Sequence, residues 1–390
     1  MTPHVLFLNH AAVLGGAELS LLDVARHRAG KGAVLLFEDG PFRERLEAAS
    51  VAVDVAVAPA SVRQVRRKGG MMQDLRSLPG VLALARAVAR RARGYEVLYA
   101  NAQKAFIVAA LAGRWTRRPV IWHLRDLLDD AHFSGLHRRV VVGLANRWAA
   151  RVIANSEATA AAFVAAGGRA AKVHVIHNGI APERFAEVDR AGVEALRESL
   201  GLRGRPVVGV FSRLAAWKGQ HVLLEALTHL PEVHALLVGA ALFDEAEYAA
   251  ALRRRAETPD LAGRIHFLGF RDDIPALLHL VNVVAHTSTA AEPFGRVVVE
   301  GMLAGRPVVA TRAGGVLEII EDGQTGLLVA PGDAGALARA VERLLAAPEE
   351  ARRLAAAGQA VARQRFSLAR MLDEIETLLH EVIGHPSTSS

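Results

Sequence analysis

Short apolar segments alternate with longer amphipathic segments along the first half of the chain. A short continuous apolar run is typical of a buried strand, whereas apolar residues that recur every three or four positions predict a helix. The predicted strands are residues 5–9, 33–37, 51–57, 96–100, 119–123, 151–155 and 173–177. A helical segment separates each strand from the next. This alternation predicts a parallel, doubly wound sheet.

The alternation restarts after a polar linker at residues 178–205. The second set of predicted strands is 206–212, 234–239, 264–269, 283–286, 307–311 and 326–330. Three helical segments follow, and a chain of 390 residues suits two domains of ~100–200 residues. We therefore predict an α/β protein with domains at residues 1–180 and 181–367, and we expect residues 386–390 to be a disordered tail.

Composition narrows the class of protein. Apolar residues make up 52% of the chain, enough for sizeable cores, and no run of 18 apolar residues occurs that would suit a membrane-spanning helix. The first residues read as a strand and not as a signal peptide. The chain has no cysteine, which excludes disulfides, thiol catalysis and cysteine-based zinc sites. We therefore expect a cytoplasmic protein.

The two halves carry opposite charge. Residues 1–190 hold 27 Lys and Arg against 16 Asp and Glu, a balance of +11. Residues 191–390 hold 20 against 24, a balance of −4, and the two sum to the net charge of +7. This asymmetry indicates a basic surface on the first domain that meets an acidic partner.

Two glutamates stand out in the segment 287–315. Glu292 and Glu300 are eight residues apart, and Pro293 follows the first. Proline suits the first turn of a helix, so we predict Glu292 at a loop-to-helix junction and Glu300 about two turns inside the helix. Eight steps of ~100° would leave the two side chains roughly 80° apart, close enough to line one cleft. Strands on either side complete a βαβ unit, in which ligands bind beyond the carboxyl ends of the strands.

This segment resembles the Glu-x7-Glu motif of the retaining glycosyltransferases of family 4, which have the GT-B fold. The likeness extends over E-P-F-G-R-V-V-V-E-G-M-L-A-G-R-P-V-V-A-T and G-G-V-L-E-I-I-E-D-G-Q-T-G-L-L-V. It implies two Rossmann-like domains that face a cleft, with the helix at 368–385 crossing back onto the first domain. It also implies a hexosyltransferase-type enzyme that moves a sugar from a nucleotide-diphosphate sugar to an acceptor hydroxyl, with retention of configuration.

The second domain would bind the donor. Arg213 and Lys218 follow a strand and precede a helix, which suits a diphosphate. The family pattern R-L-x(3)-K-G places both on the donor diphosphate, where fixed cations replace a metal; we expect no metal and no cofactor. Glu300 would bind the ribose and Glu292 the donor sugar. The other residues that we assign to the donor are Phe270, Arg271, Phe294, Gly295, Arg296 and Val297. Whether the donor is linked to UDP or GDP stays open.

Two features of the first domain belong to the predicted site. Gly15 and Gly16 precede a helix, and in the family they lie under the donor diphosphate and beside the acceptor. His123 ends a predicted strand, where its place matches the active-site histidine of the family; we read Asp126 as a partner of that histidine. The predicted catalytic residues are His123, Glu292, Arg213 and Lys218.

Other interpretations stay open at this point. A sugar-nucleotide epimerase or a phosphorylase shares the fold, and the pI of about 10.3 raises the possibility of nucleic-acid binding. Aromatic residues are only 5% of the chain and offer few platforms for base stacking, so we expect no nucleic-acid partner. The acceptor is unknown: a lipid-linked glycan, a small molecule or another glycan.

A basic segment in the first domain bears on the acceptor. Nine Lys or Arg lie between Arg63 and Arg93, opposed only by Asp74. Apolar residues are interleaved with them, so the segment could lie peripherally on an anionic membrane, at the inner face. The alternative is a solvated basic helix with a flexible acceptor-site loop.

Overall fold

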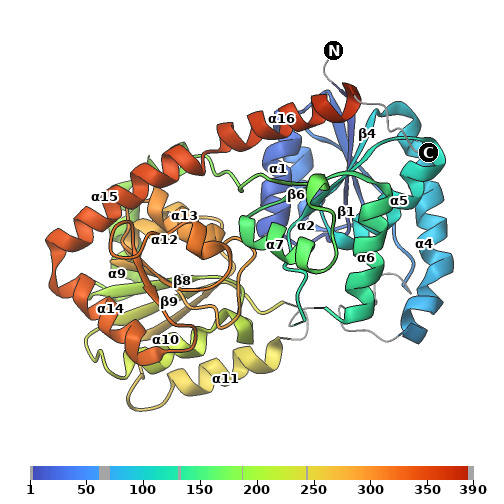
Figure 1. Cartoon of the computed structure of the whole chain (residues 1–390). Helices are drawn as coiled ribbons and strands as arrows, with labels where there is room; N and C mark the ends of the chain where they lie inside the picture. Colours follow the sequence, from blue (N-terminus) through green and yellow to red (C-terminus); the bar gives the residue numbers. More distant parts are fainter. Residues whose placement is uncertain (1–2, 61–70, 131–132, 187, 243–244, 385–390) are drawn as a thin grey trace. The chain divides into compact units, whose positions relative to one another are not determined.

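The computed structural model describes residues 3–60, 71–130, 133–186, 188–242 and 245–384. The chain divides into two compact units (Figure 1). The first unit combines Met1–Gly179 with Leu368–Ser390, and the second unit is Ile180–Ser367. The tail expected at 386–390 lies outside the described residues, as do residues 61–70, which include the start of the basic segment.

The first unit is built on seven parallel strands in the order β3-β2-β1-β4-β5-β6-β7. The strands are β1 (Val5–Asn9), β2 (Gly32–Leu36), β3 (Ala52–Val55), β4 (Val97–Ala100), β5 (Val120–Leu124), β6 (Ala149–Ala154) and β7 (Val173–Val175). Strands β1, β4 and β5 are buried along their whole length. Their sequences are apolar apart from Asn9 and His123 near the carboxyl ends, because a parallel sheet is covered on both faces.

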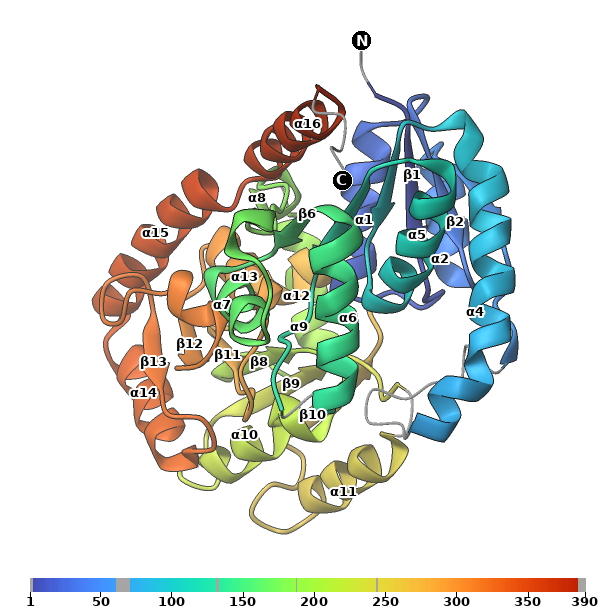
Figure 2. The same ribbon diagram turned by 45° about the vertical axis from the view of Figure 1, so that its right-hand side comes forward.

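Helices cover both faces of this sheet (Figures 1 and 2). They are α1 (Gly16–His27), α2 (Pro41–Ala48), α4 (Met71–Arg91), η1 (Ala92–Gly94), α5 (Gln103–Thr116), α6 (Gly135–Trp148), α7 (Glu157–Ala165), η2 (Ala170–Lys172) and α16 (Leu368–Gly384). Leu6 and Leu8 of β1 belong to a core with residues of α4, α5 and α6. Val5 and Phe7 point the other way, into a core with residues of α1, α2 and α16.

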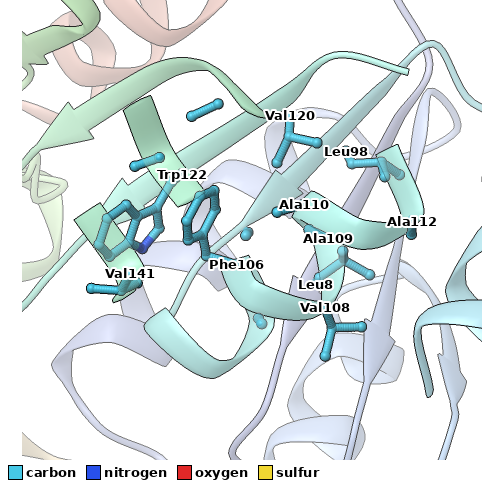
Figure 3. Packing of buried hydrophobic residues seen from close by; sticks show 14 of the residues in the cluster. Leu8, Leu98, Phe106, Val108, Ala109, Ala110, Ala112, Val120, Trp122 and Val141 are labelled. Atoms are coloured by element: carbon cyan, nitrogen blue, oxygen red, sulfur yellow. The ribbon is translucent and has the colours of Figure 1, made fainter. Parts of the chain in front are cut away.

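Figure 3 shows part of the core between α5 and the sheet. Phe106 of α5 stacks on Trp122 of β5, with ring centroids 4.5 Å apart and an angle of 10° between the rings. Leu98 and Val120, from two neighbouring strands, belong to the same cluster. Because Trp122 directly precedes His123, this packing fixes the strand end that carries the histidine.

The second unit repeats this plan with six parallel strands in the order β10-β9-β8-β11-β12-β13. The strands are β8 (Val207–Phe211), β9 (His234–Val238), β10 (Ile265–Gly269), β11 (Val283–His286), β12 (Val308–Thr311) and β13 (Leu327–Val329). Counted within the unit, this is the order 3-2-1-4-5-6 of the dinucleotide-binding Rossmann fold.

Helices also cover both faces of the second sheet. They are α8 (Glu183–Ala186), α9 (Arg190–Ser199), η3 (Ala216–Lys218), α10 (Gln220–Leu227), α11 (Ala246–Ala256), α12 (Ile274–Leu280), α13 (Arg296–Leu303), η4 (Gly315–Glu318), α14 (Ala334–Ala346) and α15 (Pro348–Arg365). Val208 and Val210 of β8 share a core with α10, α11 and α14. Val193 and Leu196 of α9 pack against the core on the opposite face, so part of the expected linker is a layer of this unit.

Each sheet reverses its winding direction between its first strand and its fourth. These points lie between β1 and β4 in the first unit and between β8 and β11 in the second. Ligands of open α/β sheets bind beyond the carboxyl ends of the strands at such a point. No helix within the described residues is long and apolar enough to cross a bilayer.

Candidate functional site

A buried ion pair lies at the switch point of the second unit. Lys218 ends η3, which follows β8, and Glu292 comes from the loop after β11; the Lys218 ammonium contacts Oε1 of Glu292. The Glu292 side chain is only 8% exposed and that of Lys218 18%. The structure thus brings together two predicted catalytic residues that are 74 positions apart in the sequence.

Two further donors hold the same carboxylate oxygen. The Ser288 hydroxyl donates to Oε1 of Glu292 at 2.6 Å, and Nε2 of His286 lies 3.2 Å from it. Nδ1 of His286 is 3.1 Å from the Thr311 hydroxyl, which fixes the ring. Oε2 of Glu292 accepts no hydrogen bond from the described residues, so this oxygen is the one left for a ligand.

The surroundings of Glu292 keep it ionised. Burial alone would raise the pKa of this carboxyl, because it disfavours the charged form. The charge of Lys218 and the hydrogen bonds from His286 and Lys218 outweigh burial and hold the pKa well below its usual range. Glu292 is therefore a fixed anion and a weak base.

Two glycines allow the backbone to approach this pair closely. Gly314 has φ of +61°, and a Cβ there would lie 2.2 Å from the carbonyl oxygen of Glu292. Gly219 has φ of +69°, and a Cβ would lie 2.0 Å from the carbonyl oxygen of Thr287. Any other residue would therefore clash and be strained at both positions. The N–H of Gly315 completes the arrangement by donating to the carbonyl of Glu292 at 2.9 Å.

Arg213 lies on the same side of the site as Lys218. The indole of Trp217 contacts both cations: the Lys218 ammonium is 4.2 Å and the Arg213 guanidinium carbon 5.7 Å from the ring centroid. Nη1 of Arg213 is 3.3 Å from Oε1 of Glu245. Gln220 is fully buried and donates to the carbonyl of Arg213 at 2.8 Å, which fixes the loop that carries the arginine.

The helix that carries Glu300 begins later than the sequence predicted. Helix α13 starts at Arg296, so Pro293 lies before the helix and not in its first turn. Gly295, at φ of +107°, turns the chain into the helix, and Glu292 forms a bridge with Gly314 instead. Glu300 is therefore about one turn inside the helix and not two. The predicted angle of 80° between the two glutamates does not apply, because only Glu300 is helical.

Glu300 pairs with Arg296 on the first turn of α13. Nη2 of Arg296 is 3.4 Å from Oε1 of Glu300, and both side chains are mostly buried. Nη1 of Arg296 is buried and finds no hydrogen-bond partner among the described residues. This pair thus presents a carboxylate and an unsatisfied donor side by side. Val297 follows within α13, whereas Phe294 packs edge-on against Phe366 in the core.

Phe270 and Arg271 follow the end of β10 as predicted. The Phe270 side chain is 57% exposed. Nε of Arg271 donates to Oδ1 of Asp273 at 2.7 Å. Asp273 is the residue before α12, but its side chain makes no capping hydrogen bond there and pairs with Arg271 instead.

The glycine pair of the first unit precedes a buried carboxyl. Gly15 is the residue before α1, which begins at Gly16. A Cβ at Gly15 would lie 2.9 Å from a carboxyl oxygen of Glu18, so a larger residue would displace that side chain. Glu18 is 7% exposed, and burial raises its pKa against a hydrogen bond from Asn9 and the charge of Arg125.

His123 is fully buried near the end of β5. Its Nδ1 contacts the Tyr99 hydroxyl and lies 3.1 Å from Nη2 of Arg125. Among the described residues, its Nε2 has no hydrogen-bond partner. Burial and the charge of Arg125 hold the pKa of His123 well below its usual value, so the ring is neutral at physiological pH.

Several residues of these sites escaped the sequence analysis. His286 ends an apolar strand and His123 lies one residue before the end of another, so the signal that selected His123 could have selected both. Tyr99 and Trp217 gave no signal, because aromatic residues at such positions are usually core. The sequence analysis named Asp126 as the partner of His123 and passed over its neighbour Arg125, which the structure places on the His123 ring.

We predict that Lys218→Met destabilises the protein more than Lys172→Met. Removing the ammonium leaves a buried carboxylate without its cation, which costs about 3–5 kcal/mol of the free energy of unfolding. Lys172 is a matched control, because its ammonium donates to backbone carbonyls at 2.6 and 3.4 Å. Urea denaturation measures the free energy of unfolding of both variants. Equal losses would show that the Lys218–Glu292 ion pair stabilises the protein no more than the contacts of Lys172.

The same pair predicts a pH dependence. The folded pKa of Glu292 lies below its unfolded value of about 4.3, so its contribution to stability is present above that pH and is lost as pH falls toward the folded pKa. Glu292→Gln should therefore lose less stability than the wild type between about pH 5 and pH 3. Parallel acid denaturation curves for the two proteins would contradict the low pKa.

The comparisons with known proteins agree with this architecture. A profile described as "Glycosyl transferases group 1" matches residues 193–361, and one described as "Glycosyl transferase 4-like domain" matches residues 15–179. The crystal structure of HepE from Anabaena in complex with UDP-glucose is 41% identical, has a TM-score of 0.89, and overlaps 97% of this chain and 99% of that chain.

Curated relatives match over a shorter part. The lipopolysaccharide core biosynthesis glycosyltransferase LpsE of Rhizobium meliloti (strain 1021) is 34% identical over 53% of this chain and 58% of its own length. The putative glycosyltransferase EpsD of Bacillus subtilis (strain 168) is 35% identical over 54% of each chain. The chain thus spans about half the length of these relatives. Together with the full-length likeness to HepE and the profiles on both halves, they show that the chain belongs to the GT-B glycosyltransferases of the family 4-like superfamily.

Proposed function

We propose that this chain is a retaining glycosyltransferase of family 4 that transfers a sugar from a UDP-sugar to an acceptor hydroxyl. The observation that carries the proposal is the cluster of Lys218, Arg213 and Glu292 at the switch point of the second unit. The relative bound to UDP-glucose makes UDP-glucose the first donor to test.

The two cations would neutralise the leaving diphosphate. Lys218 has three N–H donors, so it can bind a phosphate oxygen while keeping Glu292 as a partner. Arg213 offers a planar fork that suits phosphate geometry. Fixed positive charge at the leaving group supplies what a magnesium ion supplies in other transferases. The role of these residues in place of a metal is part of the proposal.

Glu292 and Glu300 would bind the sugars. The free Oε2 of Glu292 can accept from a donor-sugar hydroxyl, and Glu300 can accept from both hydroxyls of a ribose diol. The backbone N–H groups of Gly295 to Val297, at the start of α13, lack partners within the helix and suit a negative group. Phe270 and Arg271 would lie beside the base.

The weak basicity of Glu292 supports retention. A carboxylate whose pKa is held low by Lys218 is a poor general base for an acceptor hydroxyl. The leaving phosphate is then the better base for the acceptor hydroxyl. It lies on the face of the sugar ring from which it departs. Attack from that same face retains the anomeric configuration.

Peripheral binding to an anionic membrane at the inner face remains part of the proposal for the acceptor. The structure separates the basic residues of this region: Arg91 pairs with Asp54, and Arg86 lies 6.0 Å from the centre of the Trp115 ring. The helix α4 is 21 residues long, or about 30 Å, so its two ends are distinct surfaces. The proposed contact concerns Arg66, Arg67 and Lys68, which precede α4 in the sequence and lie outside the described residues.

We predict transfer from UDP-glucose with retention. Incubation with a panel of glycan and small-molecule acceptors should release UDP and give a product whose glucose has the α configuration of the donor, as measured by proton NMR. The reaction should continue in EDTA, because Arg213 and Lys218 hold the diphosphate. A β-linked product would exclude the retaining assignment, and activity that returns only with magnesium would exclude the role of the cations.

We predict that Glu300→Ala weakens UDP binding. Loss of charge-assisted hydrogen bonds to a ribose costs about 1.5–3 kcal/mol, roughly a tenfold to hundredfold rise in Kd. Glu342→Ala is a matched control, because Glu342 is exposed on α14 of the same unit. Calorimetric titration with UDP measures both; equal Kd values for the two variants would refute the ribose role.

We predict salt-sensitive binding to vesicles that contain anionic lipid. Cosedimentation should be strong at low salt and fall as salt screens the charges. Replacing Arg66, Arg67 and Lys68 with Ser should reduce it while leaving the Kd for UDP unchanged. If no vesicle binding occurs at low ionic strength, a soluble acceptor is the better account.

A further inference from the structure

A chain of buried polar side chains joins Arg125 to Glu18 in the first unit. Nε of Arg125 donates to Oδ1 of Asn101 at 2.8 Å, and Nδ2 of Asn101 donates to Oδ1 of Asn9 at 3.1 Å. Nδ2 of Asn9 donates to Oε1 of Glu18 at 3.3 Å. Both asparagines are fully buried at the carboxyl ends of β1 and β4, which flank the switch point.

The two ends of this chain fix the direction of every bond in it. An arginine has donors only, so the atom of Asn101 that faces it must be the oxygen. The amide nitrogen of Asn101 then faces Asn9, whose oxygen must accept, and the nitrogen of Asn9 is left to donate to Glu18. Oε1 of Glu18 accepts in either protonation state. Each bond polarises the next, so the chain holds the Arg125 guanidinium in one orientation.

The other two nitrogens of Arg125 are also committed. Nη1 donates to Oδ1 of Asn178 at 2.7 Å, and Nη2 lies 3.1 Å from Nδ1 of His123. Since Nη2 can only donate, Nδ1 of His123 must offer its lone pair. The proton of the neutral ring therefore lies on Nε2. The Tyr99 hydroxyl alone would not decide this, because it can either donate to Nδ1 or accept from it.

We propose that Arg125 is a positioning residue that fixes His123 as the Nε2–H tautomer, so that His123 donates a hydrogen bond from Nε2 to the donor substrate. The identity of that ligand follows from the proposed function; the tautomer does not depend on it. A buried donor without a partner among the described residues is costly unless a ligand supplies the acceptor. Without Arg125, His123 gains a second arrangement, in which Nδ1–H donates to Tyr99 and Nε2 can only accept.

The tautomer can be observed directly. In protein labelled with ¹⁵N-histidine, two-bond ¹⁵N–¹H correlation spectra distinguish the two tautomers, and His123→Gln assigns the signal. We expect the wild type to show the Nε2–H tautomer at neutral pH, with and without UDP. A wild-type ring protonated on Nδ1, or on both nitrogens, would overturn the proposal without any need for a variant.

Two variants separate the influence of Arg125 from that of Tyr99. Arg125→Met should give a mixture of tautomers or the Nδ1–H form, whereas Tyr99→Phe should keep Nε2–H because Arg125 still donates to Nδ1. Arg125→Lys should restore the wild-type pattern in part, because an ammonium also donates only. Arg91→Gln, which removes an arginine paired with Asp54 in the same unit, is the control and should leave His123 unchanged. Retention of pure Nε2–H in Arg125→Met would refute the role.

Kinetics give a second readout. Arg125→Met should lower kcat for transfer from UDP-glucose by about tenfold or more, because His123 no longer presents a donor to the reacting sugar. The Kd for UDP, which lacks the sugar, should change by less than about twofold. A change in the tautomer with no change in kcat would refute the link to the substrate. If the wild type transfers no sugar at all, the proposed function fails, but the spectra still test the tautomer.

Discussion

The contact between Lys218 and buried Glu292 is the constraint on which the donor site of the second unit depends. An ionised carboxylate inside a protein is stable only when a cation and hydrogen-bond donors replace its water. Lys218 supplies the charge, and Ser288 and His286 supply further bonds to the same oxygen. The glycines at 219 and 314 are a consequence of this contact, because the loops that deliver these groups must approach with no room for a Cβ. In this arrangement one carboxylate oxygen is immobilised and the other is left available.

Each unit holds a buried carboxyl group near a cation, but the two units arrange these charges differently. In the second unit the opposite charges touch, so Glu292 is a fixed anion and Lys218 remains beside Arg213 on the Trp217 ring. In the first unit two asparagines stand between Arg125 and Glu18, so the guanidinium keeps its influence on the neighbouring histidine. A positive charge 3.1 Å from an imidazole nitrogen in a dry interior keeps that ring neutral. Direct pairing of Lys218 with Glu292 thus suits the proposed site for the donor diphosphate. The separation of Arg125 from Glu18 suits a neutral His123 that donates a hydrogen bond.

The sequence predicted the strands well, because parallel strands covered on both faces are continuous apolar runs that need no partner to be recognised. It also placed Lys218, Glu292 and His123 at or after the carboxyl ends of such strands, where the structure has them. It misplaced the start of α13 because a proline was taken as the first turn, whereas Gly295 at a left-handed φ sets the boundary. It missed Arg125 on His123 and Ser288 on Glu292, because such contacts depend on side-chain directions that spacing does not contain.

The two strand-terminal histidines show why position in the sequence does not by itself identify a ligand-binding ring. His286 and His123 both lie at the carboxyl edge of a parallel sheet. Because Glu292 faces Nε2 of His286 and Arg125 faces Nδ1 of His123, the proposed tautomer has its proton on Nε2 in both rings. In His286 that proton is directed to the ionised carboxylate of Glu292, and the Thr311 hydroxyl faces the other nitrogen. The ring is thereby fully used in holding the fold of the site. In His123 both neighbours crowd Nδ1, and Nε2–H has no acceptor among the described residues. A histidine at a strand end is available to a substrate when the protein satisfies one of its nitrogens and leaves the other, and only the three-dimensional contacts reveal which of the two cases holds.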